Sequence, residues 1–94
     1  MDIHIDKNSL IPVYRQIVNA IESMIETRAL KEGDILPSMN ELAEMLEISK
    51  ETSKKAYIVL RDDGKIESKQ GKGFYVRADG EAKKLKVLAI FDKL

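Results

Sequence analysis

The chain has 94 residues, enough for one small domain with a thin hydrophobic core. Its hydrophobic fraction of 44% and charged fraction of 34% indicate a folded globular protein rather than a disordered one. The absence of cysteine excludes a disulfide framework, a cysteine-zinc site and a thiol nucleophile. No apolar run approaches the ~20 residues of a membrane span, and the N-terminus lacks the features of a signal peptide, so we expect a cytoplasmic protein with no membrane partner.

The charge of the chain is unevenly distributed, although Lys+Arg and Asp+Glu both total 16. The net charge is −2 over residues 1–34, −3 over residues 35–48 and +4 over residues 49–77. A zero total counts against nucleic-acid binding, but the distribution of charge decides which surface can meet a polyanion. The positive charge is concentrated in the second half of the chain.

The N-terminal third predicts a short extended segment followed by a helix. Ile3 and Ile5 alternate with polar residues, which fits either a small strand or an ordered arm. Pro12 suits the first turn of a helix, where its missing N–H costs nothing. From there to about Arg28 the apolar residues recur at helical spacing, so we expect an amphipathic helix with one buried face. Its Tyr14 and the methionines of the chain are expected in the core.

A second, shorter helix is predicted for residues 39–46. Leu36 precedes Pro37 and is therefore expected to be extended. Ser38 and Glu41 have the spacing of a capping box, in which each side chain bonds the backbone of the other residue.

A third helix is predicted to begin after the N-cap Ser49 and to run to about Asp62, with Gly64 in a left-handed conformation at its end. Two short strands follow, over residues 66–69 and 74–76. The glycines of the segment between them, residues 70–73, favour a hairpin turn.

The C-terminal residues change in character. Residues 77–84 are polar and predict a linker. Residues 85–91 (LKVLAIF) are almost continuously apolar, as in a strand that is buried on both faces. Because so short a run cannot bury itself, we expect either that residues 85–94 begin a truncated C-terminal domain or that they pair with another copy.

From about Leu10 to Val76 the chain resembles the N-terminal domain of the GntR family of bacterial transcription regulators. The matching residues are Pro12-Val13-Tyr14-Arg15-Gln16-Ile17, Gly33-Asp34-Ile35-Leu36-Pro37-Ser38, Glu41-Leu42-Ala43, Ile48-Ser49-Lys50-Glu51-Thr52, Ala56-Tyr57 with Leu60, Asp63-Gly64 with Ile66, and Gln70-Gly71-Lys72-Gly73-Phe74-Tyr75-Val76. The chain departs from the family pattern at Met39-Asn40, at Ser53, and at Lys54 and Lys55, where arginines are usual.

The resemblance implies a mainly α fold with a small β-hairpin: a winged helix-turn-helix of three helices plus a two-stranded wing over residues 1–76. It also implies a transcription regulator, such as a repressor, that binds double-stranded DNA at a pseudo-palindromic operator as a homodimer. Residues 83–91 resemble the first strand of a LacI-type effector domain, which implies control by a sugar-like small molecule bound to a missing C-terminal domain. A winged helix that contacts only proteins is the alternative.

In a helix-turn-helix the start of the second helix enters the major groove and the first helix braces across the backbone. Glycines in the wing let the backbone approach the minor groove closely, although they also serve simply to close a hairpin. The expected DNA contacts are Ser38, Asn40, Ser49, Lys50, Glu51, Thr52, Lys54, Lys55, Gln70, Gly71 and Lys72.

Two of these contacts have open roles. Lys54 can reach a guanine edge or only a phosphate. Glu51 can accept from a cytosine amine, or it can favour the helix N-terminus and point away from DNA. The sequence offers no nucleophile–base pair, metal cluster or phosphate loop, so we expect neither an enzyme nor a cofactor.

Overall fold

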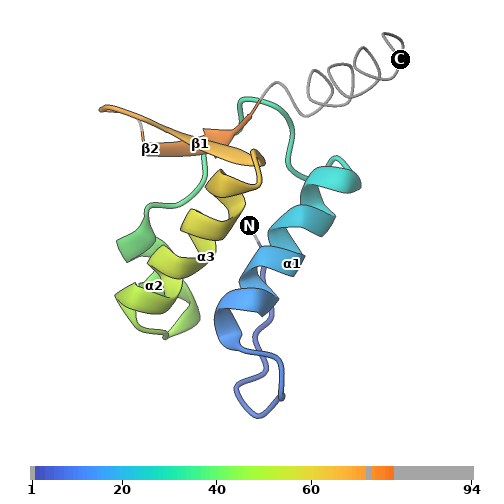
Figure 1. Ribbon diagram of the computed structural model, residues 1–94, viewed down its shortest axis with the longest axis vertical. Helices are drawn as coiled ribbons and strands as arrows, with labels where there is room; N and C mark the ends of the chain where they lie inside the picture. Colours follow the sequence, from blue (N-terminus) through green and yellow to red (C-terminus); the bar gives the residue numbers. More distant parts are fainter. Residues whose placement is uncertain (1, 72, 78–94) are drawn as a thin grey trace, which may run out of the picture.

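Three helices and a β-hairpin make up the described part of the chain, residues 2–71 and 73–77, in a computed structural model. They are α1 (Val13–Glu26), α2 (Met39–Leu46), α3 (Lys50–Asp62), β1 (Ile66–Lys69) and β2 (Gly73–Val76). The helices pack beside one another, and the hairpin extends from the end of α3 on the side of α2, away from α1 (Figure 1). The prediction of a winged helix-turn-helix is therefore confirmed.

Helix α1 buries one face, as its spacing of apolar residues requires. Ile17, Val18 and Ile21 are fully buried in the core, where α1 packs on α3. The helix ends at Glu26, slightly earlier than predicted, because Arg28 adopts a left-handed conformation with φ of 65°. The segment before the helix is an ordered arm, and the alternative of a strand is wrong for residues 2–12.

Helix α2 begins with the predicted capping box. The Ser38 hydroxyl accepts from the Glu41 N–H at 3.0 Å, and the Ser38 N–H donates to the Glu41 carboxylate at 3.0 Å. Leu42 and Ala43 are buried. Met45, by contrast, is 52% exposed, and the prediction that it lies in the core is therefore wrong. The reason is that an amphipathic helix of this length buries only one narrow face.

The hairpin is anchored from two sides. Its strands pair in antiparallel register, with Glu67 opposite Tyr75. The segment between α1 and α2 also bonds to β2, since Val76 N–H donates to Asp34 O at 2.9 Å and Leu36 N–H donates to Phe74 O at 2.9 Å. Sequence reasoning treated residues 33–37 as a turn followed by an extended pair and missed this pairing.

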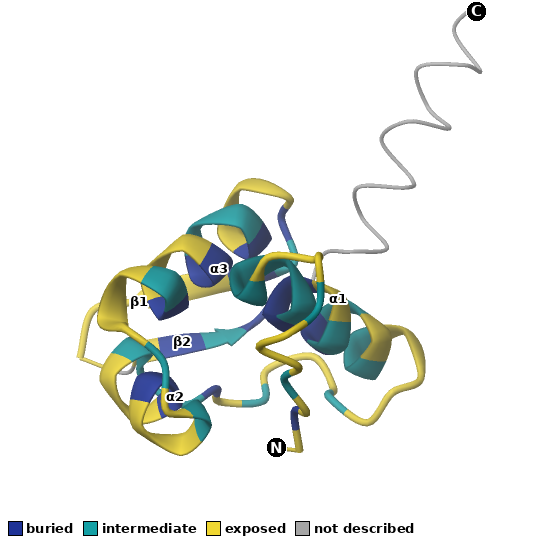
Figure 2. Ribbon diagram, turned by 90° about the horizontal axis from the view of Figure 1, so that it is seen from below, coloured by how far each residue is buried: buried dark blue, intermediate teal, exposed yellow. Residues whose placement is uncertain are grey.

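The core lies between the three helices and the hairpin, and buried residues gather on the facing sides of these elements (Figure 2). The ring of Tyr57 in α3 meets that of Phe74 in β2, with centroids 4.7 Å apart. No helix in the described part of the chain is long and apolar enough to cross a membrane. The linker and second domain predicted after Val76 lie outside the described residues, apart from Arg77.

Candidate nucleic-acid interface

Two buried side chains of α3 fix this helix on α2. The Ser53 hydroxyl donates to Met39 O at 2.8 Å, and the Tyr57 hydroxyl donates to Pro37 O at 2.6 Å. Both residues are fully buried, and burial, with a smaller effect from the charge of Glu41, raises the pKa of Tyr57 well above its ordinary value. The phenol therefore stays a donor at physiological pH. Ser53, where an aliphatic residue is usual, thus supplies a specific bond between the two helices.

The first turn of α3 is capped by its own side chains. The Ser49 hydroxyl accepts from the Thr52 N–H at 3.1 Å and lies 2.8 Å from the Thr52 hydroxyl. Ser49 is exposed and Thr52 is half-buried. These predicted contacts therefore shape the start of the helix, and each hydroxyl retains a lone pair or proton for a ligand.

The charged residues of α3 form two stripes, because residues four apart lie on the same side of a helix. Lys50 and Lys54 form one stripe, and both are exposed. Glu51 and Lys55 form the other, which faces the start of α1: together with Thr52 they line a shallow hollow whose far wall is residues 12–14. Glu51 therefore borders the hollow beside α1, whereas Lys50 and Lys54 do not line it.

Sequence reasoning missed the role of Tyr14. Its half-buried ring carries the Lys55 ammonium 4.2 Å from the ring centroid and the Arg15 guanidinium carbon at 5.4 Å. The Lys55 contact links α3 to the start of α1, whereas Arg15 belongs to the same helix as the ring. The expectation that Tyr14 is purely a core residue is thus too simple. In the sequence, only the neighbouring Arg15 indicated that the ring of Tyr14 could contact a cation.

The start of α2 presents one free amide. Asn40 is exposed, and within the described residues no hydrogen bond of its side chain is found. The Ser38 hydroxyl, in contrast, is engaged in the capping box. Asn40 thus offers its whole amide to a ligand, whereas Ser38 retains the proton of its capping hydroxyl.

The wing tip is open. Gln70 and Gly71 are exposed, while Lys72 lies outside the described residues. Gly71 and Gly73 both have φ of 81°, and a Cβ at either would meet no atom within 4 Å. Glycine at both positions therefore suits the backbone conformation, and it leaves these two positions without a side chain.

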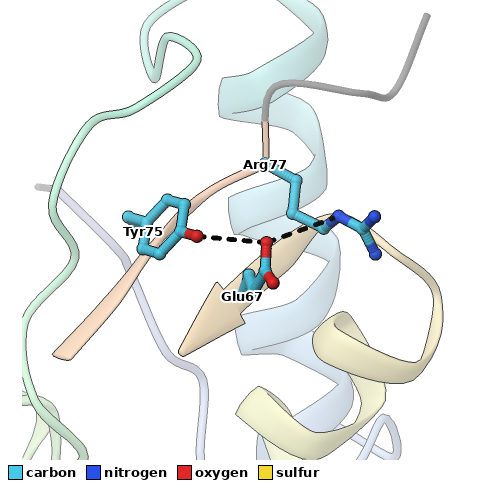
Figure 3. Close-up of polar contacts among 3 residues, drawn as sticks. All are labelled: Glu67, Tyr75 and Arg77. Atoms are coloured by element: carbon cyan, nitrogen blue, oxygen red, sulfur yellow. Dashed lines mark hydrogen bonds and ion pairs between the residues drawn. The ribbon is translucent and has the colours of Figure 1, made fainter. Parts of the chain in front are cut away.

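The one acidic residue of the wing strands is held at a distance from the tip. Glu67 accepts a hydrogen bond from the Tyr75 hydroxyl at 3.1 Å, and the Arg77 guanidinium lies 3.9 Å from the same carboxylate (Figure 3). Arg77 partly offsets the negative charge of Glu67 at the base of the wing, while Lys69 remains exposed at the end of β1.

This geometry can be compared with known proteins. Residues 13–76 match the family model described as bacterial regulatory proteins, gntR family. The chain belongs to this family. The resemblance seen in the sequence is thereby confirmed over about two thirds of its length.

Among the curated gntR relatives, the HTH-type transcriptional repressor YtrA of Bacillus subtilis is 38% identical over 74 residues, which are 79% of this chain and 57% of that protein. The mannosyl-D-glycerate transport/metabolism system repressor MngR of Escherichia coli is 37% identical over 68 residues, 72% of this chain and 28% of that protein. The chain thus spans little more than half of the first relative and a smaller part of the second. These gntR relatives are transcription regulators.

Solved structures of gntR proteins share the fold. YtrA from Sulfolobus acidocaldarius superposes with a TM-score of 0.78 at 32% identity, covering 98% of this chain and 84% of that one. The DNA-binding domain of AraR in complex with operator ORX1 superposes with a TM-score of 0.70 at 26% identity, covering 81% of this chain and 95% of that one. The second of these was solved bound to its operator.

Proposed function

We propose that this chain is the DNA-binding part of a bacterial transcription regulator. The observation that carries the proposal is the exposed Lys50–Lys54 stripe at the start of α3. The neighbouring, buried face of this helix is fixed by the bonds of Ser53 to α2 and of Tyr57 to the segment before α2. A basic stripe on a rigid helix-turn-helix fits the major groove, where lysines meet phosphates or guanine edges. The operator-bound relative supports the same assignment.

The wing adds a second contact in this proposal. Gln70 and Gly71 form an exposed tip with no side-chain bulk at the glycine, which allows the backbone to approach the minor groove. Lys72, next in the sequence, supplies the charge that a narrow groove attracts. Asn40 at the start of α2 contributes an amide for a phosphate or an adenine.

The separation of the two α3 stripes assigns different roles to their members. Lys50 and Lys54 are the principal contacts. Glu51 favours the helix N-terminus electrostatically, on the side facing α1, which supports the positioning role over cytosine recognition. Lys55, drawn onto Tyr14, reaches a phosphate beside the groove.

One such domain offers an interface of only about 600–1,000 Å². Specific binding therefore favours two copies on a pseudo-palindromic operator, and we infer a homodimer in the full-length protein. A further domain that binds a small, sugar-like effector completes the proposal, and repression is the activity that the named relatives favour.

Salt titration of DNA binding tests the proposal. A binding site is first selected from random duplex DNA, and the affinity for it is measured by gel shift or anisotropy across a range of salt concentrations. The slope of log affinity against log salt counts the phosphates that are neutralised. Lys54→Gln is expected to flatten this slope by about one unit.

Lys31→Gln is the matched control, because Lys31 is also exposed but lies between α1 and α2, away from the stripe. It should leave the slope unchanged. Equal effects of both substitutions would show a general charge effect and would contradict the proposed interface. Association that does not depend on salt, or the absence of any DNA binding, would favour the alternative of a winged helix that contacts only proteins.

A further inference from the structure

The arm before α1, residues 2–12, is held in one conformation although it contains no regular secondary structure. The Gln16 side chain accepts from the Asp6 N–H at 2.8 Å and donates to Asp6 O at 2.9 Å and Ile11 O at 2.8 Å. The Asp6 carboxylate accepts from the Asn8 N–H at 2.9 Å. At its other end, Ile3 is 9% exposed and belongs to the hydrophobic core. The arm is therefore fixed at both ends.

Lys7 lies in the middle of this fixed loop and reaches a distant part of the fold. Its ammonium donates to the backbone carbonyl of Glu47 at 2.8 Å, across 40 residues of sequence. Glu47 is the residue that ends α2, and its φ of 54° and ψ of 50° are left-handed. It is followed by Ile48, whose N–H donates to Ala43 O at 3.0 Å, and then by the cap of α3.

The conformation of Glu47 sets the direction in which the chain leaves α2 and enters α3. A left-handed conformation is unfavourable for a residue with a Cβ, so the surrounding contacts must maintain it. The Lys7 bond is such a contact, and it comes from outside the two helices. Moreover, it comes from a loop that Gln16 fastens to the first turn of α1.

We propose that Lys7 is a positioning residue for DNA recognition: through the Glu47 carbonyl, the arm fastens the turn between α2 and α3 and holds the Lys50–Lys54 stripe at its angle to the groove. This inference rests on the proposed function for its effect on DNA, whereas its structural half concerns the free protein. Lys7 itself need not touch DNA, and its ammonium is already engaged with the turn.

A direct phosphate contact by Lys7 is the competing explanation, and the salt dependence separates the two. A lysine that neutralises a phosphate contributes about one unit to the salt slope. A lysine that acts through the Glu47 carbonyl changes the affinity and leaves the slope as it is. The variants are Lys7→Met, which removes the donor but keeps the length of the side chain, and Lys7→Arg, which keeps a donor. Lys31→Met, at an exposed lysine between α1 and α2, is the control.

We expect Lys7→Met to weaken binding to the selected duplex by about threefold to tenfold with an unchanged salt slope. Lys7→Arg should restore most of the affinity, and Lys31→Met should have no effect at all. In the free protein, amide hydrogen exchange measured by NMR should become faster at Ile48 in Lys7→Met and not in Lys7→Arg, because the turn loses its tether.

A salt slope that falls by about one unit in Lys7→Met would overturn the proposal in favour of a phosphate contact. Unchanged affinity, or unchanged exchange at Ile48, would also overturn it. If the wild-type chain bound no DNA, the proposed function would fail, and the exchange at Ile48 would still decide whether Lys7 fastens the turn.

Discussion

The turn between α2 and α3 and the tip of the wing both contain left-handed residues, and they are built in opposite ways. In the turn between α2 and α3, Glu47 is surrounded by contacts: its N–H and that of Ile48 bond back into α2, and its carbonyl accepts from Lys7. At the wing tip, a Cβ added to Gly71 or Gly73 would meet no atom within 4 Å. The proposed function explains the difference: the turn would hold α3 at a fixed angle and is held by its neighbours, whereas the tip would approach DNA and has no atoms around its glycines.

The largest expected effect on the free energy of unfolding comes from the core packing of α2, the helix that leads into the turn. Leu42→Ala, in the fully buried face of α2, should lower the free energy of unfolding by about 2–5 kcal/mol, because it removes apolar contacts and leaves a cavity. Urea denaturation followed by circular dichroism measures this. Met45→Ala on the same helix is the control and should cost less than about 0.5 kcal/mol, since Met45 is exposed. Similar losses in both variants would show that core packing does not fix this region.

The next effect concerns the bond between α3 and the segment before α2. Tyr57→Phe leaves Pro37 O without its buried donor and should cost about 1–2 kcal/mol in unfolding free energy. Tyr75→Phe removes a hydroxyl that bonds an exposed carboxylate and should cost less than about 0.5 kcal/mol. Equal losses would contradict the importance of the buried bond.

The stabilisation that the Tyr57 phenol provides should also depend on pH. Its pKa in the folded state lies above the ordinary value of 10.0, so the stability due to its neutral phenol is fully present below pH 10.0 and is lost as the pH rises further. The free energies of unfolding of wild type and Tyr57→Phe, measured by denaturation at increasing pH, should therefore approach each other in the alkaline range. A constant difference between them would contradict the assigned pKa direction.

At the wing tip the expected cost is smaller and comes from the backbone alone. Gly71→Ala places a Cβ at φ of 81°, which should lower the unfolding free energy by about 1 kcal/mol although no neighbour is struck. Gln70→Ala, one residue earlier, is the control and should stay within about 0.5 kcal/mol of wild type. If Gly71→Ala were neutral, the tip would tolerate another conformation, and the contrast with the turn would be sharper still.

The smallest effect has the opposite sign. Glu47→Gly should raise the unfolding free energy by about 0.5 kcal/mol, because relief of the left-handed Cβ slightly exceeds the added freedom of the unfolded chain. Glu47→Ala keeps the Cβ and should show no such gain. A gain in both variants would indicate that the glutamate charge, and not the backbone, is responsible.

Local sequence signals predicted the helices and hairpin because each is encoded by neighbouring residues. Ser38 with Glu41 marked the start of α2, and Gly64 marked the end of α3 with the left-handed conformation found, φ of 75°. The bond from Lys7 to Glu47 and the pairing of residues 33–36 with β2 were not predictable in this way, because they join parts of the chain separated by some 40 residues. No local pattern specifies such partners.

In the candidate interface, too, some features follow from local sequence and others depend on tertiary contacts. The sequence identified the lysines of α3 and the wing glycines from their types and order. It could not predict that Lys55 lies over the ring of Tyr14 or that Ser53 bonds Met39, since both depend on the three-dimensional arrangement. Local rules therefore supply the candidate residues, and tertiary contacts determine how their side chains are held.

The pairing of residues 33–36 with β2 also has a consequence for the order of events during protein synthesis. At about 5–20 residues per second, translation adds Val76 several seconds after Gly33. Until then Gly33, Asp34 and Leu36 lack the strand that they bond in the finished fold. Residues 33–36 of the nascent chain are thus without these backbone partners during this interval, and their pairing can form only after β2 is synthesised.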